Sequence, residues 1–312
     1  MHPTHRLLAS LGLLAALAST ASAKIDRVVE KSFQVAPGAL VSVSTDGGDI
    51  RVVSSPENVV RVIAKEHIRA RSQAEADEVL AKLDLTMEQH GNEVVASASY
   101  NYGSIFRFGS TPVEVEFLVT VPASSSVRLK TSGGGILVGD LDGRVDAHTS
   151  GGDLEIGRVG GDVNASTSGG GIAIEEGRGR TKLSTSGGDI KAGLLAGDAM
   201  LDTSGGGIRV ETERGSLSAH TSGGDVNVRF EGAVRSPCTL STSGGEVTAT
   251  FDRSAAFHLD AETSGGDVKA DGVTITIEHG KLGSGALAGS VNGGGPDVKL
   301  RSSGGDVTVA LR

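Results

Sequence analysis

The chain has 312 residues, a net charge of −9, 47 glycines, one cysteine and no tryptophan. Its acidity disfavours nucleic acid and anionic membrane surfaces as partners, because both carry negative charge themselves. The single cysteine, Cys238, excludes an internal disulfide, and we expect it to be a small buried side chain.

The first 23 residues have the pattern of a secretory signal peptide. Arg6 supplies a basic start, residues 7–18 form an apolar run, and Ala21-Ser22-Ala23 is a cleavage site. The apolar run is shorter than the roughly 20 residues that cross a bilayer, and no later stretch is apolar enough to do so. We therefore expect export, to the periplasm, the outer surface or the medium, with a mature chain that begins near Lys24.

Residues 24–126 are predicted to form a β-rich head with one inserted helix. Alternating apolar residues surround the turn signal Pro37-Gly38, and further strands are expected at 59–64 and 113–121. Between these, residues 72–85 have helical spacing, with Ser72 as the N-cap residue.

Residues 127–312 are predicted to be a repeat domain built on a Thr-Ser-Gly-Gly box. Strands of two-residue periodicity flank each box, and most boxes are 18 residues apart. A fixed period of this kind indicates stacked coils, here a glycine-rich parallel β-solenoid of the β-helix or β-roll type, roughly 45 to 50 Å long at about 4.8 Å per coil. The first position of the box is occupied by Thr45, Thr131, Thr149, Thr167, Thr185, Thr203, Thr221, Thr242, Thr263 and Ser302.

Each position of the box has a structural interpretation. The threonines are expected to stack, with hydroxyls that bond one another or nearby backbone groups, and the paired glycines suit positive φ and close passage of adjacent coils. The position before the next aliphatic residue alternates between glycine and aspartate from coil to coil, as in Gly135 and Asp153. We interpret this alternation as a spacing of like charges along the stack, which lapses at Glu246 and Asp267 and could there bring two carboxylates together around a cation.

The chain resembles the bacterial putative-adhesin family of β-strand-repeat proteins. The resemblance covers essentially the whole mature chain. It rests on the Thr45-Asp46-Gly47-Gly48-Asp49-Ile50 box after an F-x-V strand pair, on the strand end Val121-Pro122, and on the serial T-S-G-G-[DG]-[IV] repeats. The resemblance implies a structural family with no catalytic residues to carry over.

The residues bear on three kinds of chemistry: calcium binding, sugar cleavage and metal binding by histidine. Calcium β-rolls place an aspartate after a third glycine, whereas here it follows the glycine pair directly. Sugar-cleaving solenoids need converging acids and aromatic platforms, and the repeat region has only three phenylalanines. His148 and His220 are expected to face solvent four coils apart, too far to share a metal. We expect no catalytic, cofactor-binding or metal-binding residues.

One irregular segment is the candidate binding site. Four of the nine aromatic residues lie between residues 100 and 108, and the candidate residues are Tyr100, Tyr102, Phe106, Arg107 and Phe108. They would either contact a partner or cover the open end of the solenoid. We expect an adhesin or interaction scaffold whose partner is a cell-envelope protein or polysaccharide. The alternatives are a carbohydrate-active β-helix enzyme and a calcium-binding module.

Overall fold

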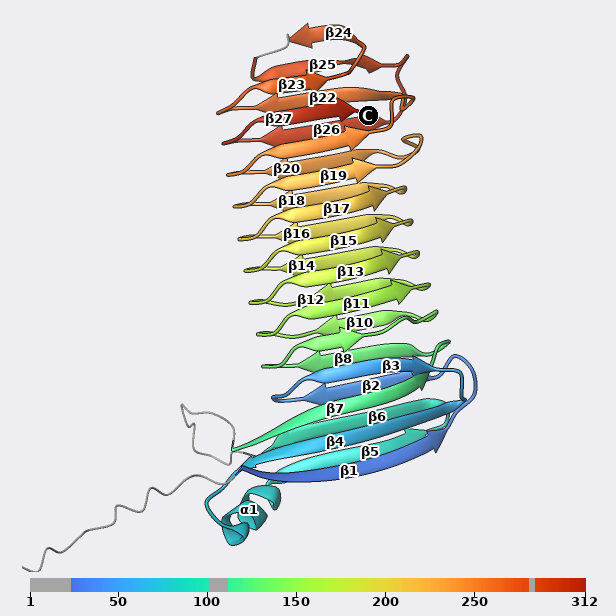
Figure 1. The fold of residues 1–312 in the computed structure, drawn as a ribbon, viewed down its shortest axis with the longest axis vertical. Helices are drawn as coiled ribbons and strands as arrows, with labels where there is room; N and C mark the ends of the chain where they lie inside the picture. The colour runs from blue at the N-terminus through green and yellow to red at the C-terminus, as the bar shows by residue number, and fades with distance from the viewer. Residues whose placement is uncertain (1–23, 102–111, 281–283) are drawn as a thin grey trace, which may run out of the picture.

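The computed structural model describes residues 24–101, 112–280 and 284–312, which form a rod of two long β-sheets (Figure 1). One sheet, here called sheet A, has 13 strands, and the other, sheet B, has 14. Most neighbouring strands are parallel and belong to different turns of the chain, so the predicted all-β parallel solenoid is confirmed. In the described part of the chain, no helix is both long and apolar enough to cross a membrane.

The rod is a stack of coils, each with one strand in sheet B and one in sheet A. Ten such strand pairs stack within the described residues. In stacking order they are β2(Leu40–Thr45) with β3(Ile50–Ser55), β8(Ser126–Thr131) with β9(Ile136–Val138), β10(Val145–His148) with β11(Leu154–Val159), β12(Val163–Ser166) with β13(Ile172–Gly177), β14(Thr181–Thr185) with β15(Ile190–Leu195), β16(Ala199–Thr203) with β17(Ile208–Glu213), β18(Leu217–Thr221) with β19(Val226–Phe230), β20(Cys238–Thr242) with β21(Val247–Phe251), β26(Asp297–Ser302) with β27(Val307–Leu311), and β22(Phe257–Thr263) with β23(Val268–Asp271).

Alternation of apolar and polar residues places the core between the two sheets. In β11, Leu154 and Ile156 are buried while Glu155 between them is exposed. Parallel in-register pairing sets Leu154 beside Ile136 on one side and Ile172 on the other. The interior is therefore a column of aliphatic side chains to which each coil contributes one layer. Each layer is buried only because the coils on either side cover it.

The coils do not stack in chain order at the C-terminal end. The strands β26 and β27 follow β22 and β23 in the sequence, yet they lie between that pair and β20–β21. The last two strands of the chain therefore lie inside the stack and do not close it. The outermost level is β22–β23, and in sheet B β25(Ala286–Val291) adds antiparallel to β22 and β24(Ile275–Gly280) antiparallel to β25. Residues 292–296 form a loop, in which Asn292 has φ 49°.

Both sheets continue through residues 24–126 without a break. β6(Glu93–Tyr100) and β7(Val113–Pro122) pair parallel to β2 and β3, and the edges are completed by antiparallel strands. These are β5(Leu83–His90) on β6, β4(Val59–Arg69) on β7, and β1(Lys24–Gln34) on β4. A domain boundary at residue 126 stays a prediction.

The inserted helix is shorter than its sequence pattern indicates. α1(Gln73–Leu80) begins after Ser72, whose hydroxyl accepts the N–H of Glu75 at 3.2 Å, as the capping pattern predicts. Residues 83–85, expected to be helical, instead open β5, which pairs along its length with β6. Here cross-strand pairing overrides helical periodicity, because the apolar residues at the start of β5 gain a sheet partner.

Candidate functional site

The box threonines bind backbone atoms of two coils at once. The hydroxyl of Thr167 donates to the carbonyl of Gly152 in the preceding coil at 2.9 Å and accepts the N–H of Gly170 in its own coil at 3.3 Å. The same pattern recurs along the stack and is completed by Ser302, which bonds the carbonyl of Gly245. The threonine hydroxyls were expected to bond either one another or the backbone, and they bond the backbone. They therefore connect successive coils and are not free as nucleophiles.

The second box glycine is required by close approach between coils, not by positive φ. A Cβ on Gly170 would lie 2.2 Å from the carbonyl oxygen of Gly152, and one on Gly188 would lie 2.4 Å from that of Gly170. Among the box glycines described, positive φ occurs at Gly48 alone. The sequence interpretation that these glycines supply positive φ is wrong for the other coils.

The alternating aspartates accept backbone N–H groups of the next coil. Asp153 Oδ1 accepts the N–H of Gly171 at 2.7 Å, and Asp189 Oδ1 accepts that of Gly207 at 2.9 Å. A glycine at this position has no side chain to accept a hydrogen bond. The backbone N–H at the same position of the next coil, such as that of Asp225 after Gly207, therefore has no acceptor within the described residues. We call this line of positions the carboxylate column.

The alternation lapses at Glu246 and Asp267, but these two residues are not neighbours. The inserted coil places Asp306 between them, and Asp306 Oδ1 accepts the N–H of Asp267 at 2.9 Å. The expected pairing of Glu246 with Asp267 is therefore wrong. Lys269 pairs with Asp306, which holds the pKa of that carboxyl below its usual range. Across the described residues, no three His, Cys, Asp or Glu side chains are grouped as metal ligands would be.

The outer face of sheet A is hollowed by a series of open grooves. An open groove of about 680 Å³ runs over β9 to β17, and smaller grooves of about 390, 430 and 530 Å³ share its lining residues. Its floor is low because Gly157, Ala173 and Gly193 stand where other coils have long side chains. We call this outer surface, from β3 to β21, the sheet A face.

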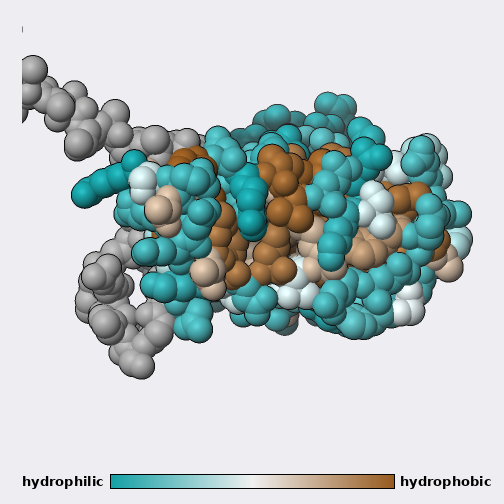
Figure 2. Space-filling model, turned by 90° about the horizontal axis from the view of Figure 1, so that it is seen from below, coloured by the Kyte–Doolittle hydropathy of each residue, from teal (hydrophilic) through white to brown (hydrophobic). Residues whose placement is uncertain are grey.

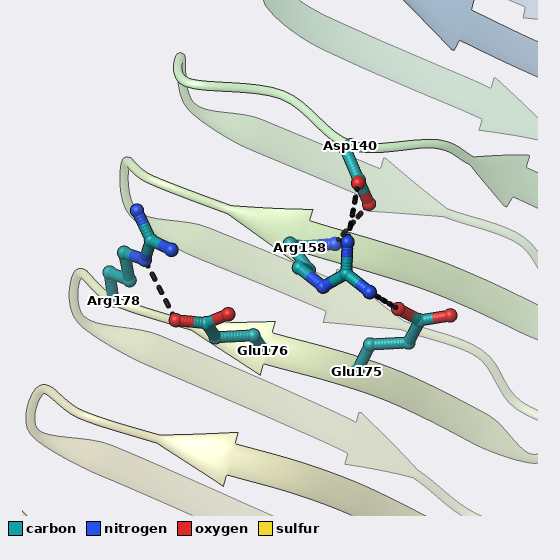
Figure 3. Close-up of polar contacts among 5 residues, drawn as sticks. All are labelled: Asp140, Arg158, Glu175, Glu176 and Arg178. Atoms are coloured by element: carbon teal, nitrogen blue, oxygen red, sulfur yellow. Dashed lines mark hydrogen bonds and ion pairs between the residues drawn. The ribbon is translucent and has the colours of Figure 1, made fainter.

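Ion pairs neutralise the bases beside one end of the sheet A face (Figure 3). Arg158 contacts Asp140 through Nη1 at 3.1 Å and Glu175 through Nη2 at 3.5 Å, and so spans three coils. Next to it, Arg178 Nε donates to Glu176 at 2.7 Å, which lowers the pKa of that carboxyl. These exposed pairs contribute little stability each, and they neutralise Arg158 and Arg178.

Further along the same face, two bases lie side by side without a partner. Lys191 of β15 and Arg209 of β17 are register neighbours, both exposed, and Asn227 of β19 follows in the same line. Neither base forms an ion pair with any described residue. Like charges at adjacent positions of a sheet destabilise it, so the repulsion between these two bases is not relieved by an ion pair.

The outer face of sheet B carries a hydrogen-bonded Asp–His–Ser relay. His148 contacts Asp146 through Nε2 at 2.7 Å and Ser166 through Nδ1 at 2.7 Å, and both predictions that His148 and His220 face solvent are confirmed. A nucleophilic serine also needs N–H donors for the oxyanion. The strands around Ser166 are paired on both sides, so their N–H groups are committed within the sheet.

A carboxyl group and a thiol are buried in the interior near the coil between Thr221 and Thr242, which is 21 residues long instead of 18. Glu213 is 1% exposed, between Leu195 and Phe230 of adjacent coils. Burial raises the pKa of its carboxyl to about 8; Oε1 accepts the N–H of Gly215 at 2.6 Å, and Oε2 has no partner in the described structure. Burial also raises the pKa of Cys238 to about 11, and the expectation that it is a buried side chain is confirmed.

The aromatic candidate site falls largely outside the described residues. Tyr102, Phe106, Arg107 and Phe108 lie there, and their predicted role stays a prediction. Tyr100 ends β6, is half-buried, and donates its backbone N–H to Asp46 Oδ2 at 2.9 Å.

The end of the rod nearest Tyr100 exposes apolar surface between polar sides (Figure 2). Half-buried residues of its two edge strands are Ile25, Val29 and Phe33 of β1 and Leu83 and Leu85 of β5.

Several solved structures are similar to this chain. A "putative adhesin" from Bacteroides fragilis is 12% identical, with 92% of this chain and 97% of that chain covered and a TM-score of 0.34. A "putative adhesin" from Parabacteroides merdae is 9% identical, with 92% and 97% covered and a TM-score of 0.44. A "putative lipid binding protein" from Parabacteroides distasonis is 10% identical, with 91% and 97% covered and a TM-score of 0.42. At these values the likeness adds nothing about function.

No curated protein matches the chain. A family profile described as Toastrack DUF4097 matches residues 41–310, which is most of the chain. The protein therefore belongs to the Toastrack DUF4097 family.

Proposed function

We propose that the protein is an exported, non-enzymatic interaction module of the cell envelope, adhesin-like in its action, whose binding surface is the sheet A face. The observation that supports this most is the line of connected open grooves along that face, from β3 to β21. A straight, shallow groove presents side chains to a long partner at many successive levels, and many weak contacts add up when the partner is a polymer.

The aromatic rings of the repeat region do not contribute to this surface. Phe230, Phe251 and Phe257 stack on one another inside the rod, with ring centroids 4.5 and 4.4 Å apart. The sheet A face therefore offers charge and hydrogen bonding instead of stacking platforms, which suits a charged or polar partner.

The proposal is tested by measuring how much of the mature chain, detected with an antibody, sediments with isolated envelope polymers. Ala173→Gln places a long, uncharged side chain in the middle of the groove and should lower the bound fraction by about tenfold. The control is Asn164→Gln, at the same level on sheet B, which should bind as the wild type does. Undiminished binding of Ala173→Gln, or no binding to any fraction, would contradict the proposal, as would shortening of the polymer by the protein.

A further inference from the structure

The structure assigns a carboxylate-binding site to the sheet A face at Gly207, where the carboxylate column lacks its own side chain. We infer that the site takes one carboxylate of an acidic polysaccharide, with Arg209, Asn227 and the N–H of Asp225 as its donors. This inference rests on the proposed function and names the partner of the same face.

The acceptor is missing at Gly207 because the carboxylate column alternates between aspartate and glycine from coil to coil. In alternate coils an aspartate accepts the N–H of the next coil, as Asp189 does for Gly207 at 2.9 Å. At Gly207 no such carboxylate exists, and the N–H of Asp225 has no acceptor in the described residues. A Cβ built on Gly207 would lie 3.6 Å from Asp225 N, so a carboxylate entering here from outside takes the place that an aspartate would fill.

Basic and amide side chains distinguish this vacancy from the other two. Two residues after the column glycine, on the same face, the three glycine coils carry Leu137, Ala173 and Arg209 respectively. Only the third has a cation on its own coil. The register neighbours of Arg209 on the two adjacent coils are Lys191 and Asn227, which add a second charge and an amide donor. Lys191 also lies beside Ala173 and Arg51 lies beside Leu137, so the other two vacancies each have one cation nearby and Gly207 has two. A groove of about 430 Å³ lies over these same residues.

The carboxylates nearest the site are already occupied. Asp189 Oδ1 accepts the N–H of Gly207 and Asp225 Oδ1 accepts that of Glu246, at 2.9 and 2.8 Å. Neither forms an ion pair with Lys191 or Arg209. The two adjacent cations thus remain free for a ligand, and its carboxylate would relieve their mutual repulsion.

At another level of the rod, an aspartate of the protein itself occupies the position that has no side chain at Gly207. At the C-terminal end Asp306 accepts the N–H of Asp267 at 2.9 Å and pairs with Lys269, two residues further on. A carboxylate in the column is therefore compatible with carboxylates in the adjacent coils when a donor side chain lies at the position of Lys269. On the coil next to Gly207, that position is held by Asn227.

The surroundings favour a polysaccharide over other anions. The exposed Glu211 lies on the groove beside Arg209 and can accept hydrogen bonds from sugar hydroxyls, whereas an ionised phosphate array offers it no donor. The strands beneath the site are paired on both sides, so they offer no edge to an extended peptide. A chain with one carboxylate per sugar and many hydroxyls uses the cations and also gives donors to Glu211.

The test is binding of the mature chain to polygalacturonate, with dextran as the neutral probe and poly-glutamate as the peptide probe. Gly207→Asp supplies the missing carboxylate from the protein itself and should weaken polygalacturonate binding by about tenfold or more. The matched control is Gly135→Asp, which fills an equivalent vacancy beside Leu137, where the next coil carries Glu155 at the position of Lys269 and a Cβ meets that coil at 3.2 Å, as against 3.1 Å at Gly207. The control should bind as the wild type does.

Because Gly207→Asp could unfold, Arg209→Gln and Lys191→Gln are measured beside it, with melting temperatures for all variants. Each should weaken polygalacturonate binding by several-fold and reduce its dependence on salt. Unchanged binding by Gly207→Asp and Arg209→Gln overturns the site. Equal or tighter binding of poly-glutamate overturns the assignment to a polysaccharide. Binding of dextran alone, lost in Ala173→Gln, overturns the carboxylate site and leaves the proposed function standing.

Discussion

The hydroxyl of Thr149 donates to the carbonyl of Gly134 in the preceding coil at 2.7 Å and accepts the N–H of Gly152 in its own coil. One buried oxygen thus joins two backbones that the sheet hydrogen bonds do not join at this corner. Because each coil repeats the arrangement, each box threonine connects two successive coils, and its replacement should weaken the contact between those two coils.

Thr149→Val should destabilise the rod by about 0.5–1.5 kcal/mol, because the half-buried carbonyl of Gly134 and the N–H of Gly152 both lose a hydrogen-bond partner. Thr149→Ser keeps the hydroxyl, as Ser302 does in its coil, and should cost less. Urea denaturation of the three proteins measures the difference. Equal stability of the valine and serine variants would show that the hydroxyl contributes nothing.

Gly152→Ala should be more damaging than its single methyl group suggests. The new Cβ would lie 2.3 Å from the carbonyl oxygen of Gly134, so adjacent coils would have to separate. Gly133→Ala is the matched control, since a Cβ there meets nothing within 4 Å. We expect a large drop in melting temperature for the first variant and almost none for the second; similar melting temperatures would argue against close approach as the reason for the glycine.

Glu213 should make the rod less stable as the pH rises. Its carboxyl has a pKa of about 8 when folded and an ordinary value of 4.5 when unfolded, so the folded state holds the proton more tightly. The stabilisation is complete below pH 4.5, declines between pH 4.5 and 8, and is absent above pH 8, with a total of up to about 4 kcal/mol.

Comparison of wild type with Glu213→Gln isolates this effect, because all other titrating groups are shared. The free energy of unfolding is measured in urea at pH 5 and pH 8.5, and the difference between the two pH values should be smaller in the variant. Glu213→Leu, which matches Leu195 in the neighbouring coil, should be more stable than wild type at pH 8.5. A decline of equal size in all three proteins would place the titration elsewhere.

Removal of residues 297–312 should loosen the C-terminal end and leave the middle of the rod intact. β22 and β23 lose the coil on which they pack, whereas coils further away touch only their own neighbours. Hydrogen exchange should show loss of protection in residues 257–291 and unchanged protection in β10 to β15. Full protection of β22 in the shortened chain would mean that it docks directly on β20.

The coil architecture could be predicted from sequence because two periodicities agree. The 18-residue interval from Thr131 to Thr221 fixes the coil, and alternation such as Leu154-Glu155-Ile156 fixes which face is buried. The stacking order at the end could not be predicted. The boxes at Thr242, Thr263 and Ser302 present nearly the same groups to a neighbour, so their order depends on the lengths and shapes of the connections.

Only part of the role of the carboxylate column could be predicted from the sequence. The alternation of Asp153 with Gly171 could be read as charge spacing, but the direction of the backbone N–H groups follows from the turn geometry. That direction makes Gly207 a vacancy beside Arg209. A search for a base two residues after a column glycine would have found the position, once the hydrogen bond from Gly171 to Asp153 was known.

The place of β26 and β27 inside the stack has a consequence for how the rod is built. Synthesis proceeds from the N-terminus, and each coil up to β21 can settle on the one completed before it. The segment that forms β22 and β23 emerges before its native neighbour, and β20–β21, the coil already completed, is not the one on which it packs. The rod therefore grows by simple addition over most of its length, and residues 257–291 reach their final place only after residues 297–311 have been made.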